Sequence, residues 1–230
     1  MALRILTWNL LHGRAVPGAG RDLLEEFVAG LAAWSWDVAL LQEVPPWWPP
    51  QLGERLHADA RLVLTSRNAL LPLRRAVAVR WPDLIKSNGG GCNAILARDR
   101  EIVAHRTLCL ARTPERRWLQ AAALPEGVWV GNLHASVRDD AGARAEAALA
   151  ARTLTQWAGE APAVLGGDFN VRGLTLPGFG LAACHDVDMV FTRELASVSE
   201  AEVLERGRLS DHAPVAITLG GDRRSVSGRP

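Results

Sequence analysis

The stretch Ala163-Val164-Leu165-Gly166-Gly167-Asp168-Phe169-Asn170 organises the rest of the chain. Its apolar run follows Pro162 and predicts a buried strand, and the two glycines permit a tight turn at its end. Asp168 and Asn170 are two residues apart, so in an extended chain both side chains point to the same side. An active-site edge and an ordinary surface turn both fit this stretch, because Gly, Asp and Asn are the commonest turn residues.

The bulk properties are those of a water-soluble globular protein with a sizeable core. The chain has 230 residues, of which 48% are hydrophobic and 22% charged, and its formal net charge is +1. We see no internal repeat and no linker between two cores, so we expect a single domain over residues 1–219. Residues 220–230 are polar and rich in Gly, Arg and Ser, which predicts a disordered tail.

The charge is unevenly distributed along the chain. Residues 61–117 contain 12 basic and 4 acidic residues, and this basic middle suits a substrate that carries phosphate. Chance clustering on a solvated surface explains the same excess equally well. Lys86 is the only lysine among 26 basic residues, a bias that reflects composition rather than a phosphate site.

Cysteine usage and the N-terminus indicate the compartment. The three cysteines, Cys92, Cys109 and Cys184, are odd in number and lack metal-type spacing, so we expect reduced thiols. No stretch is long enough to span a membrane. Residues 1–6 enter a strand pattern at once, without the layout of a signal peptide. We therefore expect a cytoplasmic protein with no membrane span.

The remaining chain reads as strands alternating with a few helices. Strands are predicted at residues 3–8, 37–44, 61–65, 76–80, 92–97, 101–110, 117–124, 128–134, 163–168 and 185–191, with a last strand fed by the polar turn at 209–214. Helices are predicted at residues 21–34 and 139–157, and a third leads from the proline-rich loop at 45–50 to His57.

Two loops offer candidate binding features. Trp47 and Trp48 form an exposed rim that stacks on a base or sugar, or they pack at the edge of the core, which we favour because large aromatics usually do so. The loop Ser87–Gly91 is glycine-rich and flexible and suits phosphate, but it lacks the Lys and Ser/Thr of a P-loop.

Polar side chains recur where the predicted strands end. They are Asn9, Glu43, His134, Asp168, Asn170, Asp211 and His212. If these strand ends converge, the carboxylates repel one another, and a hard divalent cation relieves that repulsion. Oxygen ligands from Asp, Glu and Asn favour Mg²⁺, with Mn²⁺ as a substitute. Zinc fits less well, because no paired-His or Cys spacing is present.

Short motifs in a fixed order carry a family resemblance across nearly the whole chain. They are Thr7-Trp8-Asn9, Leu41-Gln42-Glu43-Val44, Asn93-Ala94-Ile95-Leu96, Glu115-Arg116-Arg117, Asn132-Leu133-His134, Gly166 to Asn170, Val187-Asp188-Met189-Val190-Phe191 and Ser210-Asp211-His212-Ala213-Pro214-Val215. Together they resemble the endonuclease/exonuclease/phosphatase family, which includes pancreatic-type deoxyribonuclease and the exonuclease-III-like enzymes. Each motif is short, but all of them in order make coincidence very improbable.

The resemblance implies a role for each residue. Glu43, with Asn9 and Asp211, takes the metal-binding positions. The resemblance makes Asp168 and Asn170 a functional pair in which Asp168 activates water and Asn170 binds the substrate phosphate. It also makes His212, held by Asp188, a group that binds the phosphoryl. His134 contacts the phosphate or assists the leaving group, and Arg117 reaches the scissile phosphate. Asp186 is an alternative to Asp188 as the partner of His212, because residues two positions apart on a strand share a face. His12 lies close enough to Asn9 to line the cleft.

The same resemblance implies the fold class and the reaction. The expected fold is α/β (α+β), a four-layer sandwich of two mixed β-sheets flanked by helices. The expected activity is Mg²⁺-dependent phosphoester hydrolysis by an activated water, as a phosphodiesterase or nuclease acting on DNA or RNA. A phosphomonoesterase on a small nucleotide, sugar or inositol phosphate and a catalytically silent phosphate-binding protein remain as alternatives. Nothing in the sequence implies a protein partner, and we expect a monomer.

Two departures from the family pattern narrow the resemblance. Met189 stands where the family's segment has a Tyr, and the chain contains no tyrosine. The apurinic endonucleases use a Tyr near the phosphate and lack the His that His134 supplies, so that subfamily is a poorer match. The chain is also short, with little room for the extra recognition elements of the lipid and inositide enzymes.

Overall fold

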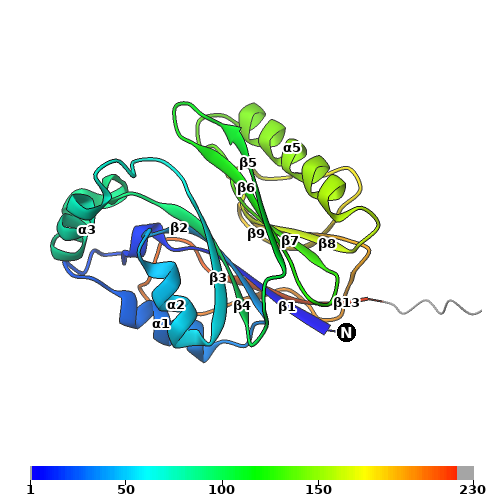
Figure 1. The fold of residues 1–230 in the computed structure, drawn as a ribbon, viewed down its shortest axis with the longest axis horizontal. Helices are drawn as coiled ribbons and strands as arrows, with labels where there is room; N and C mark the ends of the chain where they lie inside the picture. The colour runs from blue at the N-terminus through cyan, green and yellow to red at the C-terminus, as the bar shows by residue number, and fades with distance from the viewer. Residues whose placement is uncertain (1, 222–230) are drawn as a thin grey trace, which may run out of the picture.

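Two β-sheets pack face to face in this protein, and helices cover their outer faces (Figure 1). The structure, a computed structural model, describes residues 2–221. Residues 222–230 of the predicted tail lie outside the described part. The four layers confirm the α/β sandwich of two mixed sheets that the family resemblance implies.

The first sheet has the strand order β11-β13-β1-β2-β4-β3, and β12 also pairs with β13. Its strands are β1 (Ala2–Asn9), β2 (Val38–Val44), β3 (Ala58–Leu64), β4 (Cys92–Arg98), β11 (Ala196–Ser197), β12 (Glu202–Val203) and β13 (Val215–Gly220). β1 and β2 are parallel, whereas the other pairs are antiparallel. Because β1 and β2 run in the same direction, Asn9 and Glu43 arrive at the same edge of the sheet.

The second sheet has the strand order β5-β6-β7-β8-β10-β9. Its strands are β5 (Ala104–Ala111), β6 (Arg117–Ala123), β7 (Trp129–His134), β8 (Ala163–Asp168), β9 (Gly180–His185) and β10 (Asp188–Arg193). β7 and β8 are parallel, and β10 runs antiparallel to β8. The end of β7, the end of β8 and the start of β10 therefore meet at one edge.

Three apolar clusters separate the four layers. The helices are α1 (Leu24–Ala33), α2 (Trp48–Leu56), α3 (Leu71–Arg80), α4 (Pro82–Ile85) and α5 (Asp140–Ala158), with short 3-10 helices η1 (Leu11–Gly13) and η2 (Lys86–Gly89). α1 and α2 pack on the outer face of the first sheet, and α5 packs on the outer face of the second. The third cluster fills the space between the sheets.

Strand β1 shows why the sequence forms a buried layer. Leu3 and Ile5 face the second sheet, while Leu6 and Trp8 face α1 and α2. Since both faces are covered, the strand is almost continuously apolar instead of alternating with polar residues. Trp48 is also fully packed in this outer cluster and Trp47 packs against it, so the packing interpretation of the two tryptophans is confirmed.

A buried polar contact joins the two sheets directly below the polar edge. The ladder between β2 and β4 is irregular between Leu41 and Val44. Nδ2 of Asn132 on β7 donates to the carbonyl oxygens of Leu41 and Ala94, each at 2.9 Å. Nε2 of Gln42 in turn donates to Oδ1 of Asn132 at 2.8 Å. These bonds satisfy main-chain groups that the irregular ladder leaves open, and they fix the sheets in register.

Three local predictions are wrong. Residues 76–80 belong to helix α3 rather than to a strand, because the alternating Ala-Val run has helix-forming Ala and Arg and no neighbouring strand. Residues 185–191 are two strands, β9 and β10, joined by a turn at Asp186 and Val187. Most of the loop Ser87–Gly91 is helix η2.

None of the described helices is both long and apolar enough to cross a membrane. The three cysteines are unpaired, as expected.

Candidate active site

Strand register brings three of the predicted residues together. Asp168 ends β8, and His134 on the parallel strand β7 and Asp188 on the antiparallel strand β10 are its direct cross-strand neighbours. Cross-strand neighbours point to the same face of a sheet, so the three side chains lie side by side. Gly167 makes this possible: its φ is +146°, and a Cβ there would lie 1.8 Å from the carbonyl oxygen of Leu133. Only glycine fits so close to β7.

Asp168 is the buried centre of the site. Only 1% of its surface is exposed, and its two oxygens accept hydrogen bonds from Nδ2 of Asn9 and from the main-chain N–H of Asn170, both at 3.0 Å. Burial raises the pKa of Asp168 to about 6, with a further contribution from Asp188, while the His212 cation and both hydrogen bonds oppose the shift. A carboxylate that titrates near neutral pH is suited to general-base catalysis.

His212 forms a close pair with Asp188. Nδ1 of His212 lies 2.7 Å from Oδ2 of Asp188, and its Nε2 lies 3.8 Å from Oδ2 of Asp168. Burial lowers the pKa of His212, but the hydrogen bond to Asp188 and the charges of Asp188 and Asp168 outweigh it and raise the pKa to about 9. The imidazole is therefore a cation at neutral pH, held by one carboxylate and directed at the other.

Main-chain and side-chain contacts fix the loop that carries His212. Nε1 of Trp8 donates to the carbonyl oxygen of His212 at 2.9 Å. Oγ of Ser210 donates to the carbonyl oxygen of Asn9 at 2.7 Å and accepts from the main-chain N–H of His212 at 3.1 Å. The loop between β12 and β13 is thus tied to the end of β1, which explains how residues about 200 positions apart meet.

His134 is buried and neutral. Burial lowers its pKa well below the ordinary value, and the positive charges of Arg117 and His212 lower it further. Its Nε2 lies 3.6 Å from Asp168 and 3.8 Å from Glu43, too far for direct hydrogen bonds. The ring nitrogen therefore remains available to a substrate between these two carboxylates.

Glu43 occupies a strained position and faces a histidine. Its φ is +50°, in a region that a non-glycine residue adopts at some cost. Oε2 of Glu43 lies 3.2 Å from Nε2 of His12, whose Nδ1 is 3.1 Å from the carbonyl oxygen of Gly90. Because a carbonyl only accepts, Nδ1 carries the hydrogen, and burial lowers the pKa of His12. The neutral ring then presents a lone pair to a carboxylate, an arrangement that a bound cation relieves.

Arg117 reaches the same region from β6. It is buried, and its Nη2 donates to Oε2 of Glu115 at 2.9 Å. A cavity of about 200 Å³ opens beside it. The cavity is lined by His12, Glu43, Thr65, Ser66, Arg67, Ser87, Glu115, Arg116, Arg117, His134 and Val137. Glu43, His134 and Arg117, three of the residues predicted from the sequence, therefore share one cavity.

Three predicted residues are arranged differently from the expectation. Nδ2 of Asn170 donates to the carbonyl oxygen of Ala135 at 3.0 Å, so the side chain supports the strand end. Nδ2 of Asn9 donates to Asp168, and its Oδ1 accepts from the main-chain N–H of Leu11. Asp211 is exposed, and its Oδ1 lies 3.5 Å from Oγ of Ser210. Of the proposed metal set, Glu43 is thus the member whose carboxylate lines the cavity.

A second group of residues also has the geometry of a cation site. Ligand atoms of Asp168, Asp188 and His212 all lie within 4.8 Å of one another. From the sequence we assigned these three residues to catalysis and not to metal binding. Their spacing along the chain does not show that their ligand atoms lie close together in the fold.

Two further candidates from the sequence are resolved by the geometry. Asp186 does not share a strand face with Asp188: it lies in the turn between β9 and β10, with φ +56°, and pairs with Arg172 on the surface. His12 contributes more than the sequence indicated. In the sequence, its position three residues after Asn9 indicated that His12 lines the cleft. That position did not show that His12 contacts Glu43.

Comparisons with known proteins agree with this geometry. A family model described as "Endonuclease/Exonuclease/phosphatase family" matches residues 6–212. No curated protein matches the chain. Among solved structures, an endonuclease/exonuclease/phosphatase from Bacteroides vulgatus is 17% identical, with 96% of this chain and 100% of that chain covered and a TM-score of 0.69.

Two other solved structures are similar. An endonuclease/exonuclease/phosphatase from Beutenbergia cavernae is 19% identical over 95% of this chain and 71% of that chain, with a TM-score of 0.67. TDP2 from Caenorhabditis elegans is 16% identical over 96% of this chain and 75% of that chain, also with a TM-score of 0.67. Identities this low establish a shared fold and leave activity to be argued from the site.

Proposed function

The chain belongs to the endonuclease/exonuclease/phosphatase family, and from that premise we propose that it is a metal-dependent phosphoester hydrolase, acting as a phosphodiesterase or nuclease. One observation carries the proposal. A buried carboxylate with a pKa of about 6, on Asp168, faces a histidine cation with a pKa of about 9, on His212. Between them they supply a base for water and a positive charge for phosphate at the same pH.

Asp168 is the group that takes the proton from the attacking water. Asn9 and the main-chain N–H of Asn170 hold its two oxygens, so the carboxylate keeps one orientation. The water attacks phosphorus in line with the leaving oxygen, and no covalent intermediate forms. Asn170 is a positioning residue in this account, because its side chain stabilises the strand end instead of reaching the cavity.

His212 and Arg117 stabilise negative charge on the phosphoryl group. Asp188 holds His212 in its charged form and fixes its ring, and Arg117 supplies a second, permanent cation from the wall of the cavity. His134 is neutral, so it donates a hydrogen bond to phosphate or to the leaving oxygen more readily than it transfers a proton.

A divalent cation fits the donor set. Glu43 would hold it from the wall of the cavity, and Asn9 and Asp211, which the family resemblance adds to the set, would have to turn from their present hydrogen bonds to join it. Oxygen ligands of this kind favour Mg²⁺ or Mn²⁺ over zinc. When bound, such an ion neutralises charge that develops on the phosphoryl and leaving-group oxygens. The close approach of the Glu43 carboxylate to the lone pair of His12 supports a cation at this end of the cavity.

A phosphomonoesterase is the second candidate. The cavity is small and its wall includes Arg67, Arg116 and Arg117. A dianionic phosphate monoester matches this charge better than a single phosphodiester does. A catalytically silent phosphate-binding protein is the third reading of the same site.

We also propose that residues 1–219 form one domain that acts as a monomer in the cytoplasm. Three unpaired cysteines, one of them fully buried, are compatible with a reducing compartment. The proposal implies no protein partner for catalysis.

A hydrolysis panel tests the function. Single- and double-stranded DNA, RNA, bis-p-nitrophenyl phosphate and p-nitrophenyl phosphate are incubated with Mg²⁺, Mn²⁺ or EDTA. We expect metal-dependent cleavage of diesters that Asp168→Asn and His134→Ala reduce and that the surface variant Asp186→Asn leaves unchanged. Steep salt dependence identifies a nuclease, since nucleic acid binding releases counterions. Equal turnover in Asp168→Asn contradicts the proposal.

A further inference from the structure

The segment from α3 to α4 presents apolar side chains to solvent. No residue of α3 is buried. Five large hydrophobic residues of this segment are exposed: Leu70 by 74%, Leu73 by 63%, Val79 by 42%, Trp81 by 52% and Leu84 by 78%. Among the described residues, twelve large hydrophobics are exposed, and five of them fall within these fifteen positions. So dense a cluster marks an interaction surface rather than scattered exposure.

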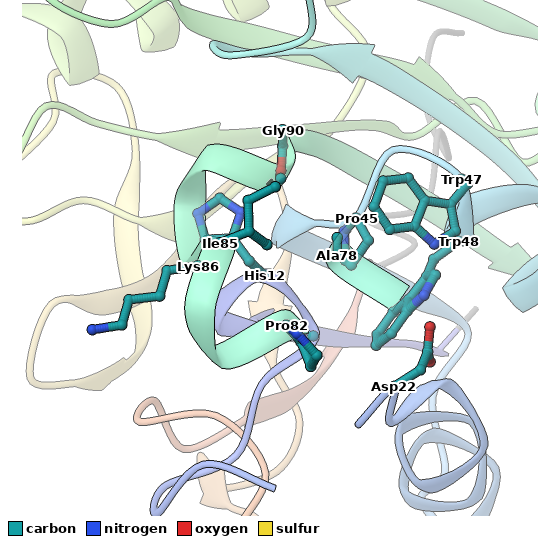
Figure 2. Close-up of a pocket in the computed structure, with 12 residues that line it drawn as sticks. His12, Asp22, Pro45, Trp47, Trp48, Ala78, Pro82, Ile85, Lys86 and Gly90 are labelled. Atoms are coloured by element: carbon teal, nitrogen blue, oxygen red, sulfur yellow. Dashed lines mark hydrogen bonds between the residues drawn. The ribbon is translucent and has the colours of Figure 1, made fainter. Parts of the chain in front are cut away.

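The opposite side of the segment lies against the rest of the protein, with Pro82 buried and Ala78 and Ile85 half-buried. Figure 2 shows Ala78, Pro82 and Ile85 lining one pocket with Pro45 and Trp48, while the side chain of Lys86 extends away. The space left between them is about 20 Å³, room for about one water and for no larger ligand. α3 therefore keeps its inner face on the body of the protein, and it lies at the outer edge of the molecule, apart from both sheets (Figure 1).

Basic residues surround the exposed apolar side chains. Between residues 67 and 86 the chain has five basic residues and one acidic residue, whereas the rest of the chain has 21 basic and 24 acidic. Arg80 and Lys86 have no acidic partner within 4 Å among the described residues, whereas the guanidinium of Arg75 lies over the ring of Trp47, 6.0 Å from its centroid, beside α2. Asp83, the one acid, accepts from the main-chain N–H of Gly20. The surface is thus locally cationic on a protein that is otherwise slightly acidic.

We propose that the α3–α4 surface, defined by Leu70, Leu73, Arg80, Trp81, Leu84 and Lys86, docks on an anionic phospholipid bilayer. Cations lie at the level of lipid phosphates, and leucines and a tryptophan enter the boundary between headgroups and acyl chains. The cationic charge complements anionic lipid, and each basic residue near such a surface adds to the attraction.

Two other occupants fit less well. A nucleic acid satisfies the arginines, but it leaves Leu70, Leu73 and Leu84 against a charged backbone with nothing apolar to cover them. A second copy of this chain, in a two-fold contact, sets the same cationic surface against itself, and the like charges repel. The bilayer is the partner that uses both the charge and the apolar area.

Docking also has a consequence for the candidate active site. Ser66, Arg67 and Ser87, which flank the α3–α4 surface in the chain, line the cavity beside Glu43. A docked molecule would therefore hold the cavity next to the headgroup layer, where phosphoesters of lipids are concentrated. This consequence rests on the proposed function, whereas the docking itself does not.

Vesicle binding by the full-length chain tests the proposal. Sucrose-loaded vesicles of phosphatidylcholine alone, or mixed with phosphatidylglycerol, are sedimented with the protein at near-physiological salt. We expect binding to the mixed vesicles and none to phosphatidylcholine alone. The pair Arg80→Ser and Lys86→Ser should lower the partition coefficient about 30-fold, since each charge contributes about fivefold. The pair Trp81→Ser and Leu84→Ser should lower it at least about tenfold.

Matched pairs elsewhere on the surface are the controls. Arg152→Ser with Arg208→Ser removes the same charge, and Leu181→Ser with Val198→Ser removes exposed apolar area; both pairs should bind like the wild type. Melting temperature and hydrolysis of a soluble diester show that each variant is folded, so a failure of docking is separable from a failure of the proposed function.

Three results overturn the proposal. The first is equal binding to both kinds of vesicle, or to neither. The second is an equal loss of binding in the control pairs. The third is a different occupant: duplex DNA bound through Arg80 and Lys86, or a dimer in solution that Trp81→Ser with Leu84→Ser dissociates.

Discussion

Replacing Asp188 with asparagine should discharge His212 without moving it. The pKa of His212 is about 9 because its hydrogen bond to Asp188 and the nearby carboxylates outweigh burial. Asparagine keeps an oxygen that accepts from Nδ1, yet it removes the charge. Burial then dominates, and we expect the pKa of His212 to fall below about 7.

The magnitude follows from the two pKa values. At about pH 8 a group with a pKa of about 9 is about 90% protonated, and one with a pKa below 7 is less than about 10% protonated. We therefore expect kcat/KM for a soluble diester to fall about tenfold at pH 8 and little at about pH 6. Asp188 also raises the pKa of Asp168, so the acidic limb of the profile should move to lower pH as well.

NMR titration of the histidine rings in metal-free protein is the direct assay, with the His212 signal assigned by its loss in His212→Asn. Asp186→Asn is the matched control, because Asp186 is exposed in the neighbouring turn. A His212 pKa that stays near 9 in Asp188→Asn refutes the reasoning, and so does an activity loss that is independent of pH.

The same pair gives the sign of a stability change. The folded-state pKa of His212 lies above its ordinary value of about 6.5, so its stabilising contribution is complete below about pH 6.5 and is lost as pH rises through about 9. Urea unfolding of the wild type should show this decline between those pH values. Asp188→Asn should not show it.

Three further predictions concern the supports of the site. The amide of Gln in His12→Gln lies where Nε2 of His12 lies, so this variant should keep its Mn²⁺ affinity within about threefold of the wild type. The shorter side chain in His12→Asn cannot reach Glu43, so the Mn²⁺ affinity of that variant should fall at least about tenfold. Calorimetry measures both affinities. Gly167→Ala should cost at least about 3 kcal/mol in urea unfolding, because its Cβ meets the Leu133 carbonyl, whereas Gly173→Ala, in open space at φ +60°, should cost about 1 kcal/mol. Mg²⁺ at about a hundred times its Kd should raise the free energy of unfolding of the wild type by about 2.7 kcal/mol and that of Glu43→Gln much less. The opposite order of the two variants in any of these three comparisons contradicts the role given to His12, Gly167 or Glu43.

The strands that carry the site could be predicted from local sequence. β8 is an apolar run that ends in two glycines, and β1 and β2 end at Asn9 and near Glu43 in the same way. The motif order then implied the four-layer fold. Each strand and each motif is a short continuous stretch, so it can be recognised from the sequence without knowledge of the fold.

The remainder depends on contacts between distant elements. Residues 76–80 alternate like a strand, but no neighbouring strand exists for them, and only the tertiary structure shows this. The contact between His12 and Glu43 arises because parallel strands β1 and β2 end at one edge. The exposure of Leu73 and Leu84 is likewise visible only once the inner face of the segment is packed.

The central claim is that a water held by Asp168 attacks phosphorus. Hydrolysis of bis-p-nitrophenyl phosphate in ¹⁸O-labelled water, with Mg²⁺ or Mn²⁺, tests it most directly. We predict that the label enters the phosphate product, and that Asp168→Asn slows this turnover at least about 100-fold while Asp186→Asn does not. Label in the released nitrophenol, or turnover that does not depend on Asp168, would contradict the account.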